Sequence, residues 1–163
     1  MAYALQSLLR IRTMREDRAS AELSAARQAV RQAEQALEDR KEDLRRFEET
    51  KDERRESIYK AVMGHKITRD ELDRVLEGIA RIDEEGALKA DNVSLAEAEL
   101  HKKEESAEQA RTSFVKASKE RMKISEHKSI WLADEAKEIE HRQETELEDF
   151  TGKKNTENMN DDD

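Results

Sequence analysis

Two long heptad patterns run along this sequence, and a single short interruption at residues 62–72 separates them. Apolar or small residues recur at alternating steps of three and four through residues 5–61 and again through residues 72–131. This spacing places one stripe of each helix against a partner helix, as in a coiled coil. No proline is present to break either helix. The pattern therefore predicts an all-α fold in which two long helices pair with each other.

The interruption has the residues of a tight turn between two helices. Thr68 and Glu71 form a capping-box pattern, and Ile67 and Leu72 stand where a hydrophobic staple packs. Gly64 can adopt the left-handed conformation that ends the first helix. A connection this short returns the chain antiparallel to itself, which gives a two-helix antiparallel coiled-coil hairpin. The expected bounds are residues 4–63 for helix one, 64–67 for the turn and 68–150 for a longer helix two.

Folding the chain at this turn predicts which residues face each other. Gly86 is expected to lie opposite Leu44 and Phe47, where the missing side chain leaves room for the Phe47 ring. Arg12 and Glu16 are expected to face Arg121. We interpret that polar layer as a device that fixes the register of the two helices.

The two ends of the chain carry more apolar groups than one seam can bury. Helix two continues beyond the reach of helix one through Leu132, Ala136, Ile139, Leu147 and Phe150. The start of helix one is also rich in apolar side chains, which are Tyr3, Leu5, Leu8, Leu9, Ile11 and Met14. Such surfaces indicate docking to another protein; the alternatives are local folding-back of residues 132–150 or pairing with a second copy. Residues 151–163 are expected to form a disordered acidic tail.

Composition excludes several classes of protein. With 44% charged and 35% hydrophobic residues, the chain cannot enclose a large globular core. It has no cysteine, which excludes disulfides and thiolate metal sites. Its net charge of -9 argues against general nucleic-acid binding. No apolar run is long enough for direct membrane insertion. A cytoplasmic location is expected.

The patterns of catalytic and metal sites are missing from the sequence. None of the four histidines lies three or four residues from another, and Glu138 with His141 forms a single Glu-x-x-His rather than the two that a di-iron bundle requires. The sequence has no glycine-rich phosphate loop and no nucleophile elbow. A thin hairpin also offers no pocket that would desolvate a carboxylate. We therefore expect no enzyme activity, no metal and no cofactor.

Two segments resemble YscO-type type III secretion proteins. Residues 4–19, ALQSLLRIRTMREDRA, are similar to the opening of that family, which reads roughly Leu-Leu-x-Ile/Val-Arg-x-x-Arg-x-Asp/Glu-x-Ala. Residues 64–74, GHKITRDELDR, are similar to the Gly-x-x-Leu/Ile-Thr-Arg-x-Glu-Leu at the tip of the family's hairpin. YscO proteins and their flagellar relative FliJ are similar to the central stalk of rotary ATPases. The resemblance to this secretion family implies a role in protein transport and virulence.

The resemblance also implies partners and sites. The open end of the hairpin would enter a hexameric export ATPase and promote its assembly or activity, the tip would contact the cytoplasmic domain of the membrane export gate, and export chaperones would bind. The protein would then lie in the cytoplasm, peripheral to the inner-membrane secretion apparatus. The residues implied for ATPase binding are Leu5, Leu8, Leu9, Ile11, Arg12, Arg15, Asp17, Trp131, Leu132 and Ile139. Those implied for export-gate binding are Met63, Ile67, Arg69, Leu72 and Leu76.

Two other functions fit the same patterns. The chain could be a homodimeric coiled-coil spacer or scaffold, whose exposed apolar groups would serve self-association. It could also be a coiled-coil chaperone that shields apolar segments of several clients. A stalk is expected to be an elongated monomer when free, whereas a spacer would be a stable dimer.

Overall fold

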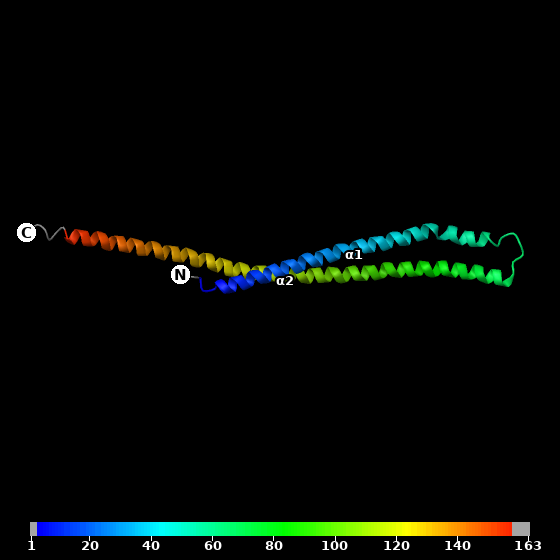
Figure 1. The fold of residues 1–163 in the computed structure, drawn as a ribbon, viewed down its shortest axis with the longest axis horizontal. Coiled ribbons are helices and arrows are strands. Elements are labelled where there is room, and N and C mark those ends of the chain that lie inside the picture. The colour runs from blue at the N-terminus through cyan, green and yellow to red at the C-terminus, as the bar shows by residue number, and fades with distance from the viewer. Residues whose placement is uncertain (1–2, 158–163) are drawn as a thin grey trace, which may run out of the picture. The chain divides into compact units, whose positions relative to one another are not determined.

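The computed structural model describes residues 3–157, and it describes side chains for residues 3–148. It contains two α-helices, α1 (Gln6–Lys60) and α2 (Arg69–Glu157), and no strand within the described residues (Figure 1). The helices run antiparallel and pack against each other, and α2 is the longer at 89 residues against 55. The predicted all-α two-helix hairpin with unequal arms is confirmed.

The first helix ends earlier than its sequence pattern suggested. α1 stops at Lys60. The residues after it still form backbone hydrogen bonds to the last turn: Ala61 N donates to Ser57 O at 3.3 Å, and Met63 N donates to Tyr59 O at 3.1 Å. Gly64 then adopts a φ of +90°, a conformation that side chains other than glycine rarely allow. Gly64 therefore has the expected positive φ, but it lies inside the connection, residues 61–68, rather than at the end of the helix.

The capping box at the start of α2 forms as predicted. The backbone N–H of Thr68 donates to Glu71 Oε2 at 2.7 Å, and the backbone N–H of Glu71 donates to Thr68 Oγ1 at 3.3 Å. Two amides that have no partner inside the helix are satisfied in this way. The bond from the Thr68 backbone, followed by the bond from its hydroxyl, lowers the pKa of Glu71. Ile67 and Leu72, the expected staple pair, are both exposed.

Thr68→Ala is expected to lower the free energy of unfolding by about 1 kcal/mol, because one orphaned amide of α2 loses its acceptor. A lowered folded-state pKa means that the Glu71 contribution is present above the ordinary glutamate pKa and is lost as the pH falls through the folded value. The difference between wild type and variant should therefore shrink on acidification. Urea unfolding followed by circular dichroism measures both effects. Thr68→Ser keeps the hydroxyl and should behave as wild type; an equal loss in that variant would contradict the capping role.

The second helix continues past residue 150, where the sequence pattern was expected to end it. α2 extends to Glu157, so it passes through Gly152 and covers the first part of the segment predicted to be a disordered tail. A glycine inside a helix is about 1 kcal/mol less favourable than alanine, which weakens the helix without forcing it to end, and no proline comes after it to stop the helix. Phe150 and residues 158–163 lie outside the residues whose side chains or backbone are described.

The chain divides into two compact units, which are described separately. The terminal unit comprises residues 1–19 and 113–163, and the hairpin unit comprises residues 20–112. Tyr3 and Ala19 are buried in the terminal unit, whereas the buried residues of the hairpin unit are Leu23, Phe47, Val75 and Ile82. Apart from Tyr3, the buried apolar residues among those described are single side chains along the seam, as the low apolar content predicts.

Phe47 and Gly86 pack closely against each other in the hairpin unit. Phe47 is 5% exposed, and a Cβ added at Gly86 would lie only 2.8 Å from its Cε1 atom. The predicted pairing of Gly86 with Phe47 is confirmed. Two cations flank the ring, with Arg54 at 5.5 Å and Lys89 at 6.0 Å from its centroid.

Ion pairs between the helices accompany this contact. Lys89 Nζ lies 2.7 Å from Asp43 Oδ2, and Arg54 Nη2 lies 2.7 Å from Glu85 Oε2. These hydrogen bonds lower the pKa of both carboxyl groups. Exposed pairs of this kind contribute little to stability, but pairs placed across the seam favour one register over its neighbours.

Candidate docking site

Tyr3 anchors the terminal unit, although it lies before the first residue of α1. Its ring is 7% exposed and packs at centroid distances of 5.4 Å from Trp131 and 5.8 Å from His127. Its Oη atom lies 2.8 Å from His127 Nδ1. From the sequence, Tyr3 was counted only among the apolar groups of the N-terminus and was not identified as an anchor.

Polar contacts fix the start of α1 beside the same stretch of α2. Gln6 N donates to Tyr3 O at 3.1 Å, which forms the turn that leads into the helix. Lys128 Nζ donates to Gln6 Oε1 at 2.8 Å. The first turn of α1 is therefore attached to α2 both through a buried ring and through a side-chain hydrogen bond.

The predicted polar layer forms farther along this unit. Arg121 makes an ion pair with Glu16, as expected, and Arg12 makes an ion pair with Glu120, the residue next to Arg121. The Glu16 side chain is 16% exposed and the Arg12 side chain 27% exposed. Partly buried ion pairs are sensitive to the loss of one partner, so a shift of register here would leave charges without partners.

All ten residues assigned to ATPase binding belong to the terminal unit. The structure thus brings together two groups that are far apart in the sequence, one from the start of α1 and one from α2. Six of them are exposed: Leu5, Ile11, Arg15, Asp17, Leu132 and Ile139. The other four are half-buried and take part in the unit's own packing or lie at its seam: Leu8, Leu9, Arg12 and Trp131.

Further exposed apolar side chains in this unit were not assigned a role from the sequence. They are Val115 at 41%, Met122 at 51% and Ile130 at 63% exposure, whereas Met14, at 62%, was already counted from the sequence among the apolar groups of the N-terminus. Each lies off the heptad seam, so a search for seam positions passes over it. An apolar residue at a polar heptad position was the signal that could have identified them.

The five residues assigned to the export gate are all exposed in the hairpin unit. Four of the five are apolar. Among these four, Met63 has the largest exposed fraction, 70%, and Ile67 the smallest, 38%. A shallow groove of about 420 Å³ lies in the same part of the unit. It is lined by Ser57, Ile58, Ala61, Val62, Glu71, Arg74 and Val75.

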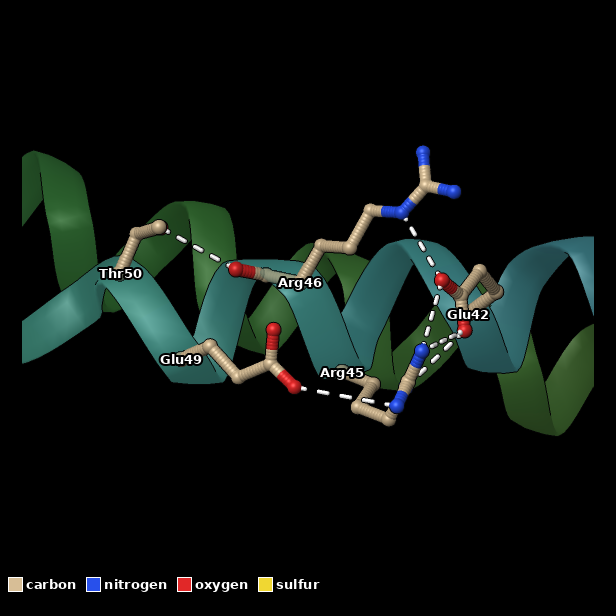
Figure 2. Close-up of polar contacts among 5 residues, drawn as sticks. All are labelled: Glu42, Arg45, Arg46, Glu49 and Thr50. Carbon is tan, nitrogen blue, oxygen red and sulfur yellow. Dashed lines mark hydrogen bonds and ion pairs between the residues drawn. The ribbon is translucent and has the colours of Figure 1, made fainter.

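Acidic side chains along the helices are paired with nearby bases. Figure 2 shows Glu42, whose carboxylate accepts from Arg45 Nε at 2.9 Å and from Arg46 Nε at 2.9 Å. Both hydrogen bonds lower the pKa of Glu42, and the bond from Arg45 has the larger effect. Lys103 has the same effect on the pKa of Glu99. A carboxyl group that acts as a general acid near neutral pH needs a raised pKa, whereas the pKa values of Glu42 and Glu99 are lowered.

Membrane-spanning and metal-binding features are missing from the part of the chain that the structure describes. Within residues 3–157, neither helix has an apolar stretch that could cross a membrane. Among the described side chains, no three potential ligands gather into a group that could hold a metal ion.

Comparison with known proteins gives one family and one related structure. The family model described as "Type III secretion protein YscO" matches residues 5–153. A solved structure of CT670 from Chlamydia trachomatis, described as that of a proposed YscO homologue, is similar to this fold with a TM-score of 0.71 and 20% identity. The similarity covers 100% of this chain and 99% of that one. No curated protein matches the sequence.

Proposed function

Because this chain belongs to the YscO family of type III secretion proteins, we propose that it is the non-enzymatic central stalk of a type III secretion system. In this role the terminal unit docks in the hexameric export ATPase and promotes its assembly or activity. The protein acts in the cytoplasm beside the inner-membrane apparatus, with no cofactor.

The observation that carries the proposal is the apolar surface of the terminal unit. Leu5, Ile11, Leu132 and Ile139 are between 36% and 51% exposed. The unit's internal contact between α1 and α2 involves other side chains, among them the buried Tyr3 and Ala19. Exposed apolar groups that the unit does not use for its own packing are typical of a protein–protein interface.

Docking can alter the ATPase without any chemistry in the stalk. A single stalk in a ring of six subunits contacts those subunits unequally. Contacts that differ between subunits favour different nucleotide states in those subunits. The stalk changes the rate of ATP hydrolysis only as far as it binds one nucleotide state of a subunit more tightly than another. Paired helices with fixed register suit this role, because the asymmetry depends on which side chains face which subunit.

The turn supports a second contact in the same proposal. Met63 and Ile67 are exposed apolar groups in the stretch that joins the helices, and Leu72 and Leu76 are exposed apolar groups at the start of α2, where Arg69 is also exposed. We assign them to the cytoplasmic domain of the export gate. Export chaperones are the third class of partner in this proposal.

Ile11→Asp is expected to abolish stimulation of the ATPase while the helices remain intact. Ile11 is 48% exposed, so a charge there is tolerated by the fold but would be desolvated in an interface. Loss of an interface hot spot weakens binding by about 30-fold. ATP hydrolysis by the purified cognate ATPase, titrated with wild type and variant, measures the effect, and circular dichroism checks the fold.

Leu88→Asp provides the matched control, because Leu88 is 61% exposed and lies in the hairpin unit. This variant should stimulate the ATPase as wild type does. Full stimulation by Ile11→Asp would reject the docking assignment. A stable dimer in sedimentation, together with no effect of the wild type on the ATPase, would favour a homodimeric spacer instead.

A further inference from the structure

We propose that the part of α2 beyond Trp131 docks into an apolar groove whose rim carries lysine and arginine side chains. This inference rests on the proposed function and specifies the chemistry of the surface that the ATPase presents. It concerns residues 132–148, which belong to the terminal unit.

An apolar stripe runs along this part of α2. Leu132, Ala136 and Ile139 recur at steps of four and three, so they share one face of the helix. Leu132 is 51% exposed and Ile139 is 46% exposed, and Leu147, at 65%, lies on the same side of the helix beyond the polar Gln143. Helices that bind in grooves present apolar anchors at this spacing.

Acidic residues border the stripe on both sides. At about 100° per residue, Glu140 and Glu144 lie along one edge, and Glu135 and Glu146 lie along the other. Residues 132–148 contain seven acids and only two bases. A partner surface that receives the stripe must therefore lie close to two rows of negative charge.

The two bases of this segment pair with acids that lie outside those rows. Lys137 Nζ lies 3.9 Å from Asp134 Oδ1, and Arg142 Nη2 lies 3.2 Å from Glu138 Oε2. Each base is thus already associated with an acid of its own helix. The field beside the stripe remains negative, which favours a cationic rim on the partner.

The same charges disfavour a second copy of the stripe as the occupant. Two stripes packed face to face would bring the acidic rows of both helices together, and like charges across an interface are costly. A groove with an apolar floor and a basic rim satisfies both features of the surface. The negative rows would then speed association and set orientation, while the stripe would supply the buried contact.

Binding of the full-length protein to the purified cognate ATPase hexamer, measured over a salt series, tests this inference. Affinity of the wild type is expected to fall as the salt concentration rises. The variant Glu140→Lys/Glu144→Lys should bind about tenfold more weakly at low salt and show a flatter salt dependence. Ile139→Asn should weaken binding at every salt concentration, since an apolar contact is not screened.

The matched control is Glu84→Lys/Asp91→Lys, which makes the same change of charge at exposed positions of the hairpin unit. It should bind within about twofold of wild type. If the wild type binds but Glu140→Lys/Glu144→Lys binds equally well, the basic groove is rejected and the proposed function stands. If the wild type does not bind the ATPase at all, both fail. Self-association of the wild type that Ile139→Asn removes would identify a second copy as the occupant and overturn the inference.

Discussion

Gly86→Val is expected to lower the free energy of unfolding by about 2 kcal/mol. A Cβ at this position would lie 2.8 Å from Phe47 Cε1 and 3.3 Å from Cζ, so the ring would have to move. Phe47 is 5% exposed and lies between two cations that belong to interhelical ion pairs, and a displaced ring would disturb those pairs as well. The better helix propensity of valine offsets only part of this loss. Urea unfolding followed by circular dichroism gives the value.

Gly78→Val is the matched control, because it makes the same substitution in the same helix. A Cβ at Gly78 would lie 3.1 Å from Ile58 Cδ1, the mobile end of a flexible side chain that can shift by the small amount required. Its effect should stay below about 1 kcal/mol. In a Phe47→Leu background the cost of Gly86→Val should fall, since the smaller side chain leaves room. Equal losses at the two glycines, or no change in that background, would contradict the steric explanation.

Much of the hairpin could be predicted because local and periodic signals agree in this sequence. The Thr68–Glu71 cap depends on residues three apart, and the structure forms it as predicted. Counting back from the turn was accurate enough to pair Gly86 with Phe47 and Glu16 with Arg121. Such counting works because a coiled coil has one residue spacing throughout, so the position of one turn sets the whole register.

The remaining features depend on contacts that no periodicity records. The ion-pair partner of Arg12 is Glu120, which was not predicted, since long side chains reach neighbouring positions that the backbone register does not distinguish. Tyr3 precedes α1 and so has no heptad position, yet it is among the most buried residues of the chain. Gly152 does not end α2, which continues to Glu157. A glycine permits the left-handed conformation that ends a helix but does not require it.

Tyr3→Ala is expected to detach the first turn of α1 from α2, at a cost of about 3 kcal/mol. The substitution removes a ring that is 7% exposed, together with its contacts to Trp131 and His127 and the hydrogen bond between its Oη atom and His127 Nδ1. Trp131 is the one tryptophan in the sequence, so its fluorescence reports this site alone. Its emission should shift to longer wavelength as water reaches the indole, and amide exchange should speed up in the first turn of α1.

Tyr3→Phe separates the ring from the hydroxyl. This variant keeps the packing against Trp131 and should lose only about 1 kcal/mol, with little change in emission. Because Leu5 and Leu8 lie just after Tyr3 in the chain, Tyr3→Ala should also reduce stimulation of the ATPase, whereas Tyr3→Phe should not. Unchanged Trp131 emission in Tyr3→Ala would show that the ring does not hold the N-terminus in place. Reduced stimulation with unchanged emission would instead make Tyr3 a direct contact of the partner.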